Sequence, residues 1–138
     1  MTQFPEFWAK LFAKFDPQDI KTRRGPGGRD LQYVTARTVM NRLDDVVGPE
    51  NWYDVYEHVH GGIMCELTIR MPDGTLRTKV DGAAFATDED EEDIHKACYS
   101  EALKRAAVKF GVARYLYRDR VPDFVREVLS HKAEDHRP

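Results

Sequence analysis

Four cations and an aromatic ring gather in a short segment of this sequence. Lys21, Arg23, Arg24 and Arg29 stand close to Tyr33, with Asp30 the one acid among them. Such a cluster repels itself unless an anion relieves it. Cations that follow phosphates, interleaved with flat rings on which bases stack, are what a single-stranded nucleic acid requires. The segment therefore predicts a site for a single strand, with contacts mainly to phosphates and little sequence preference.

A second set of cations lies far along the chain, in a helix predicted for residues 91–113. Lys104, Arg105 and Lys109 share one face of it. A solvated helix face, with Glu101 paired to Arg105 one turn later, would by itself account for these charges. Together with the basic segment at residues 21–33, however, these cations predict a groove in which the two basic segments form opposite walls. Another face carries an apolar stripe that should pack on a sheet, formed by Tyr99, Leu103, Ala106 and Phe110.

The formal net charge of −3 conceals this distribution. Residues 21–42 carry six Lys and Arg against one acid, and residues 94–120 carry seven against two. The intervening residues, 43–93, carry fourteen acids against three bases. The Debye length at physiological salt is about 8 Å, so local fields rather than the total charge decide whether a polyanion binds. The acidic average therefore does not exclude nucleic acid.

A metal-dependent nuclease is one alternative. Glu66, Asp73 and Asp81, with Lys79, could form its site, because a divalent ion needs converging carboxylates. Asp73 and Asp81 each precede a glycine, however, and that pattern is typical of turns. We therefore expect no enzymatic activity.

A zinc site is a second alternative, formed by His58, His60 and Cys65. Cys65 falls on the apolar face of a predicted strand, and no fourth ligand follows at a useful spacing. Cys65 and Cys98 are the two cysteines of the chain and are typical of reduced thiols. We expect no bound metal and no cofactor.

The periodicity of apolar residues predicts an α+β fold in one domain, residues 1–131, with a disordered tail at residues 132–138. The long helix should pack on an antiparallel meander, flanked by short terminal helices. No apolar run approaches the roughly 18 residues of a membrane span. The predicted elements are a helix within 3–15, a basic β-hairpin at 19–24 and 30–35, a helix from Thr35 to Gly48, strands at 52–60, 63–71 and 76–85, the long helix, and a helix at 123–130.

Two strings resemble those of a known family. Residues 35–52, TARTVMNRLDDVVGPENW, are similar to the helix-to-strand segment of single-strand annealing proteins of the Rad52 type, which include bacterial DdrA and phage Sak-like members. Residues 101–111, EALKRAAVKFG, resemble the family's helix motif Asp/Glu-x-Leu-Lys-Arg-Ala-x-x-x-Phe-Gly. The resemblance spans residues 18–118.

The resemblance implies binding of single-stranded DNA and annealing of complementary strands in DNA repair and recombination. It also implies a homo-oligomeric ring or filament with a basic groove round its outside. Arg37, Lys104 and Arg105 match the family's phosphate contacts. The sequence departs at Val108, where eukaryotic members place a further arginine, with Lys109 as its neighbour, and at Pro49, near an expected groove tyrosine.

These patterns together predict which residues and partners take part in binding. The expected partners are single-stranded DNA, further copies of the chain through Trp8, Phe12 and the hairpin, and a single-strand DNA-binding protein. The expected location is cytoplasmic, with a bacterial nucleoid-associated or phage-encoded protein and no membrane. The predicted DNA contacts are Arg37, Lys104, Arg105, Lys109, Lys21, Arg23, Arg24, Arg29 and Tyr33.

A double-stranded RNA-binding domain remains the alternative within the binding proteins. Its helix, three antiparallel strands and helix follow the same order, and it reads duplex RNA by shape and 2′-hydroxyl contacts. In that module the basic cluster opens the last helix. Here the acidic run at residues 88–93 precedes it and Lys104 lies in its middle, so that the basic hairpin would be unexplained.

Overall fold

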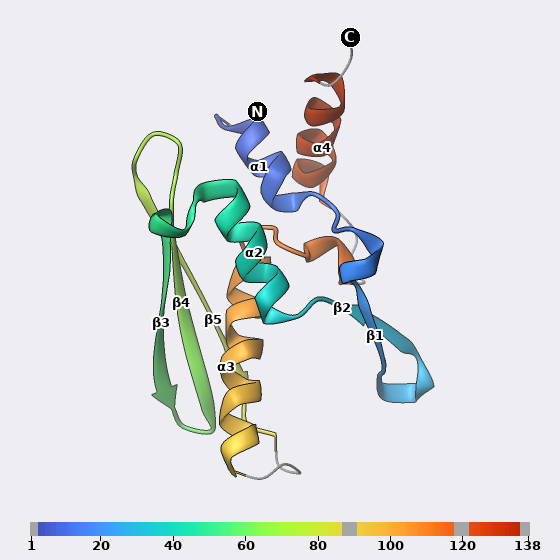
Figure 1. Ribbon diagram of the computed structural model, residues 1–138, viewed down its shortest axis with the longest axis vertical. Helices are drawn as coiled ribbons and strands as arrows, with labels where there is room; N and C mark the ends of the chain where they lie inside the picture. The colour runs from blue at the N-terminus through green and yellow to red at the C-terminus, as the bar shows by residue number, and fades with distance from the viewer. Residues whose placement is uncertain (1–2, 87–90, 118–121, 136–138) are drawn as a thin grey trace.

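A three-stranded antiparallel sheet stands at one side of the molecule, with one long helix beside it (Figure 1). Strands β3 (Trp52–Val59), β4 (Gly62–Arg70) and β5 (Leu76–Ala84) lie in this order, with β4 in the middle. Helix α3 (Glu91–Val108) packs against β4 and β5. The computed structural model describes residues 3–86, 91–117 and 122–135, and there the predicted α+β fold is confirmed.

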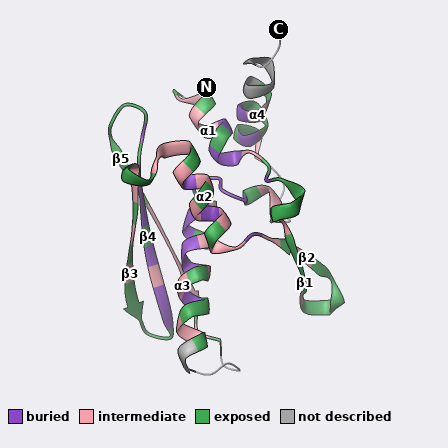
Figure 2. Cartoon of the chain, in the orientation of Figure 1, coloured by how far each residue is buried: buried purple, intermediate pink, exposed green. Residues whose placement is uncertain are grey.

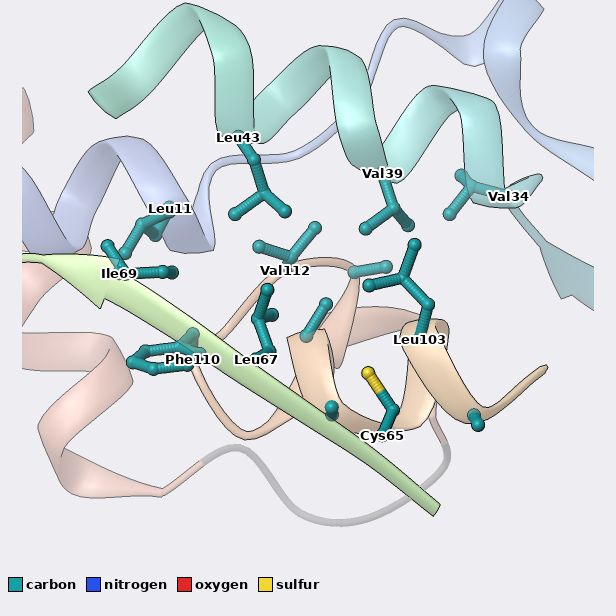
Figure 3. Packing of buried hydrophobic residues seen from close by; sticks show 14 of the residues in the cluster. Leu11, Val34, Val39, Leu43, Cys65, Leu67, Ile69, Leu103, Phe110 and Val112 are labelled. Carbon is teal, nitrogen blue, oxygen red and sulfur yellow. The ribbon is translucent and has the colours of Figure 1, made fainter. Parts of the chain in front are cut away.

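Alternation along β4 decides which face of the sheet is buried. Ile63, Cys65, Leu67 and Ile69 are fully buried and point toward α3. Figure 3 shows Leu67 and Cys65 among Leu103 and other core side chains of the helices. The expected apolar stripe is confirmed, since Ala106 of α3 and Phe110, two residues beyond its end, are also fully buried and Tyr99 is half-buried.

The hairpin stands apart from this sheet. Strands β1 (Lys21–Arg24) and β2 (Asp30–Tyr33) pair antiparallel and form a separate two-stranded sheet. Figure 2 shows the hairpin exposed along most of its length. The turn between the strands holds Gly27 and Gly28 at φ of 75° and 77°, a conformation that glycine adopts without steric cost. The basic hairpin predicted from the sequence is therefore present.

Helix α2 (Ala36–Val47) connects the hairpin to the sheet. The Thr35 hydroxyl oxygen accepts a hydrogen bond from the Thr38 N–H at 3.2 Å, which confirms Thr35 as the N-cap. Gly48, at φ 91°, ends the helix. Val39 and Leu43 of α2 reach the core beside α3 (Figure 3).

Helices α1 (Pro5–Phe12) and α4 (Asp123–Asp135) pack side by side (Figure 1). The Phe124 ring lies 6.1 Å from that of Trp8 and 5.8 Å from that of Phe12, measured between ring centres. Phe12 is only 4% exposed, so the expectation that it contacts another subunit was wrong: its own chain covers it. Trp8 is half-buried.

None of the helices in the described part of the chain has the length and apolar character needed to cross a bilayer.

The ends of the two C-terminal helices differ from the sequence-based expectation. Helix α4 reaches Asp135, so it includes residues 132–135, for which we expected disorder. Helix α3 ends at Val108 rather than near residue 113. Gly111, at φ 98°, follows it, and a Cβ at this position would overlap the Phe12 ring. Half of the acidic run, residues 88–90, lies outside the described residues.

Arg42 holds α1 to α2. Its guanidinium donates hydrogen bonds to the carbonyls of Lys10, Leu11, Ala13 and Lys14, which close the end of α1, at 2.7–3.4 Å. It also lies 3.9 Å from the centre of the Phe15 ring. Burial lowers the pKa of this guanidinium. One of the six cations in residues 21–42 therefore has a structural role rather than a surface one.

Candidate nucleic-acid interface

The register of the hairpin divides its cations between two faces. Lys21 pairs with Tyr33, and Arg24 pairs with Asp30. Because side chains alternate along a strand, Lys21 and Arg23 share a face with Tyr33, whereas Arg24 lies on the other face beside Asp30. Lys21, Arg23, Arg24 and Arg29 are all exposed. The face with Tyr33 thus combines cations with an aromatic ring, as a single strand requires.

The hairpin and helix α3 meet around the Tyr33 ring. The guanidinium carbon of Arg23 lies 5.5 Å from the ring centre, and the ammonium nitrogen of Lys104 lies 5.3 Å from it. Each distance is within the about 6 Å over which a cation is attracted to an aromatic face. The structure therefore brings together Arg23, Tyr33 and Lys104, which come from the two basic segments of the sequence.

A cavity of about 210 Å³ opens between the hairpin and α3. Arg23, Tyr33 and Lys104 line it, together with Glu101 and Tyr117. Tyr117 is 44% exposed, and its partial burial raises the pKa of its hydroxyl, which the Glu101 carboxylate raises further. Tyr117 was not among the residues predicted from the sequence, because it lies beyond the helix in an irregular segment without periodicity.

Charge pairing on α3 differs from the expected pattern. Glu101 pairs with Lys104, at 3.5 Å between Oε2 and Nζ, and not with Arg105. Arg105 instead contacts Asp81 on β5, with 3.5 Å between Nε and Oδ1. Lys104 therefore lies on the hairpin side of α3, whereas Arg105 lies on the sheet side.

A further group of cations follows the line between α3 and β5. The Lys109 ammonium lies 3.9 Å from Oδ2 of Asp81 and donates a hydrogen bond to the Val80 carbonyl. Lys79 of β5 lies 5.4 Å from the Phe110 ring centre. Burial lowers the pKa of Lys79, and the neighbouring charges of Arg114, Lys109 and Arg77 lower it further. Asp81 is the carboxylate that neutralises part of this group.

Comparison with known proteins identifies the family. The family model described as Rad52/22 family double-strand break repair protein matches residues 3–135, most of the chain. The chain belongs to the Rad52/22 family. Proteins named single-stranded DNA-binding protein DdrA from Deinococcus radiodurans and Deinococcus deserti are each 38% identical to it over 91 residues. The matched part is 63% of this chain but 40% and 41% of those relatives, so the match spans about two fifths of their length.

The helix motif of the Rad52/22 family combines packing with charge in this chain. Within residues 101–111 the buried positions are Ala102, Leu103, Ala106, Ala107 and Phe110. Lys104, Arg105 and Lys109 occupy the positions between them and reach the edges of the helix. Gly111 closes the motif because Phe12 leaves no room for a side chain there. The resemblance found in the sequence is confirmed by the family match, and the packing and charge of residues 101–111 give its motif a physical reason.

Arg37 is exposed on the first turn of α2, four residues after Tyr33. The contacts among the described residues do not join it to Lys104 or Arg105. The structure thus unites Arg23, Tyr33 and Lys104 in one cavity, places Arg105 and Lys109 at β5, and leaves Arg37, Lys21, Arg24 and Arg29 exposed.

The residues of the metal-site alternatives lie apart. Asp73 accepts hydrogen bonds from the Thr75 N–H and hydroxyl in the β4–β5 turn, as its Asp-Gly pattern predicted. Asp81, eight positions after Asp73, lies in β5 opposite Cys65. The turn predicted from its Asp-Gly pattern was therefore wrong. Cys65 is fully buried, and burial raises its pKa to about 11. Within the described ranges, 3–86, 91–117 and 122–135, no three His, Cys, Asp or Glu side chains are grouped to hold a metal.

Proposed function

We propose that this chain binds single-stranded DNA on the surface formed by the hairpin and α3, and that an oligomer of it anneals complementary strands during DNA repair. The observation that carries this proposal is the position of Tyr33 between Arg23 and Lys104. Two cations over one half-buried aromatic ring place phosphate contacts next to an aromatic side chain, the combination that a single strand requires. Family membership and the name of the DdrA relatives support the same substrate.

The proposed phosphate contacts form two groups. Lys21, Arg23 and Tyr33 on one face of the hairpin, with Lys104, form the first. Arg105 and Lys109 beside β5 form the second, whose charge Asp81 partly neutralises. Arg37, Arg24 and Arg29 are exposed cations that extend the positive field. Counterion release from these contacts would supply affinity without sequence preference.

Annealing is proposed to need several protomers. One protomer offers only a short basic surface, so a long strand needs many such surfaces end to end. A heterologous contact that closes into a ring provides this arrangement. The exposed hairpin and the half-buried Trp8 remain the candidates for the contact, whereas Phe12 is occupied within its own chain. Binding and annealing of this kind require no catalysis.

A single-strand DNA-binding protein is a proposed partner. The proposed location is the cytoplasm, at the nucleoid or in an infected cell.

A competition assay tests the substrate. Labelled single-stranded DNA is bound to the protein and displaced by unlabelled single-stranded DNA, duplex DNA or duplex RNA of equal length. We expect the single strand to compete best, and the logarithm of affinity to fall with that of salt by about 0.7 for each neutralised phosphate. Preference for duplex RNA would overturn the proposal in favour of an RNA-binding domain.

The solution mass of the protein, free and with an oligonucleotide, tests the assembly. It is measured alongside the annealing rate of two complementary strands. We expect an oligomer and faster annealing than without protein. A monomer that persists on DNA and leaves the annealing rate unchanged would contradict the annealing part of the proposal, while tight single-strand binding would still support the rest.

A further inference from the structure

The cavity between the hairpin and α3 is more than a basic surface, because much of its lining is apolar. Leu31 and Val34 from the hairpin, and Ala113 and Leu116 from the segment after α3, contribute apolar side chains to it. Arg23, Lys104 and Glu101 contribute the charged groups. An apolar space with a few polar groups is typical of a ligand site rather than of a surface that only attracts phosphates.

The size of this cavity restricts what it can hold. Its volume of about 210 Å³ is below the roughly 300–1,000 Å³ of sites for drug-sized ligands. An apolar cavity of about 150 Å³ is large enough for benzene. The space therefore fits one six-membered ring with its substituents, and a pyrimidine base has this size.

The side chains around the cavity match a base that is attached to a phosphate backbone. Tyr33 and Tyr117 both contribute to its walls, and an aromatic ring can stack on the face of any base. Gln32 and Glu101 offer hydrogen-bonding groups to the edge of a base. Arg23 and Lys104 lie beside Tyr33, where they can hold the phosphates on either side.

The backbone beyond α3 has an uncommon conformation that shapes the same wall. Ala113 adopts φ 64°, and among the described residues it is the one non-glycine residue in the left-handed region. This conformation is sterically unfavourable for alanine, and such residues cluster at functional sites. It turns the chain after the helix so that Leu116 and Tyr117 reach the cavity.

We propose that this cavity holds one nucleobase of the bound single strand, of pyrimidine size, between the hairpin and the segment Ala113–Tyr117. The inference rests on the proposed function and adds to it a site for a base, in addition to contacts with phosphates. A strand bound in this way has one base per protomer withdrawn from pairing, while its neighbours remain available to a complementary strand.

The test compares two probes of equal length, an oligothymidylate and an abasic strand with the same deoxyribose-phosphate backbone. We expect wild type to bind the oligothymidylate at least about fivefold tighter, the contribution of stacking one base. Tyr117→Leu should lower affinity for the oligothymidylate and leave affinity for the abasic strand unchanged. Leu31→Phe, which fills the cavity but keeps both tyrosines, should have the same effect.

Two controls separate this site from the general surface. Tyr53→Leu makes the same change at an exposed tyrosine of β3 and should affect neither probe. Lys104→Gln should weaken both probes equally. Thermal melting confirms that each variant is folded, and the solution mass should stay that of wild type.

Other results would overturn the inference. Equal losses on both probes in Tyr117→Leu would mean that the cavity takes no base, while the proposed DNA binding would stand. A changed solution mass in Tyr117→Leu would assign the cavity to a contact between copies of the chain. Displacement of the oligothymidylate by free thymidine monophosphate would assign it to free nucleotides. Failure of wild type to bind either probe would overturn the proposed function itself, and this inference with it.

Discussion

The ammonium nitrogen of Lys104 lies 5.3 Å from the centre of the Tyr33 ring, although one residue belongs to helix α3 and the other to the hairpin. The Lys104 side chain is only 20% exposed and also pairs with Glu101. A cation held in this way by a ring and a carboxylate is already oriented before a ligand arrives. Less freedom is then lost when a phosphate binds, which favours affinity.

Lys104→Gln should lower affinity for single-stranded DNA at least about tenfold, because a charge-assisted contact contributes about 1.5–3 kcal/mol. The melting temperature should change little, since the pair with the partly exposed Glu101 contributes about 0–1 kcal/mol. Fluorescence anisotropy over a range of salt measures both the affinity and its salt slope.

Arg126→Gln is the matched control for Lys104→Gln. Arg126 lies on α4, is exposed and pairs with Asp123 one turn earlier, so the change removes the same charge outside the proposed surface. Its effect on DNA affinity should be small. Equal losses in the two variants would mean that diffuse charge, rather than the site around Tyr33, accounts for binding.

Asp81→Asn should strengthen the binding of single-stranded DNA. The Asp81 carboxylate contacts both Arg105 and Lys109, so we expect it to compete with a phosphate for these cations. Its removal frees two positive charges, so affinity should rise several-fold and the salt dependence should become steeper. Asp123→Asn at an exposed position of α4 removes the same charge and should leave affinity nearly unchanged. A weaker affinity in Asp81→Asn would show that Asp81 positions Arg105 and Lys109 for binding rather than competing with DNA.

Arg42→Met should destabilise the protein without a direct loss of DNA binding. The substitution keeps much of the apolar stem but leaves the carbonyls at the end of α1 without their donor. Losing a charged donor to partly buried groups costs about 1.5–3 kcal/mol, which should lower the melting temperature by several degrees. Affinity per folded molecule, measured well below the melting temperature, should equal that of wild type. A variant with unchanged stability and weakened binding would instead place Arg42 among the DNA contacts.

Local patterns in the sequence were sufficient to predict most elements of the fold. The alternation at Ile63, Cys65, Leu67 and Ile69 predicts β4 and its buried face, because side chains in a strand point to opposite sides in turn. Thr35 predicts the start of α2 for a similarly local reason, since its side chain binds the backbone three residues later.

The contacts of the site depend on distances that the sequence does not contain. The i,i+4 spacing favours a Glu101–Arg105 pair, but folding places Asp81 of β5 next to Arg105. The apolar period continues through Phe110, yet the helix ends at Val108. Gly111 follows at φ 98°, a conformation that stops helices and favours glycine. Tyr117 follows Gly111 in an irregular segment, so no periodic pattern in the sequence predicts its position in the cavity.

Alkaline pH should destabilise the protein through Cys65. This thiol is fully buried, and burial raises its pKa from 9.0 to about 11. The folded state therefore keeps its proton at a pH where the unfolded state has lost it. The contribution to stability is fully present below about pH 9 and is lost as the pH rises toward 11, by up to about 1.4 kcal/mol per pH unit.

Cys65→Val lacks this group, so its stability relative to wild type should increase steadily over that range in urea unfolding. Tyr56→Phe, introduced into both proteins, removes the neighbouring phenol, whose pKa burial also raises, and should leave the difference in slope in place. Parallel stability curves for the two proteins between pH 9 and 11 would show that the thiol is accessible to hydroxide in the folded state.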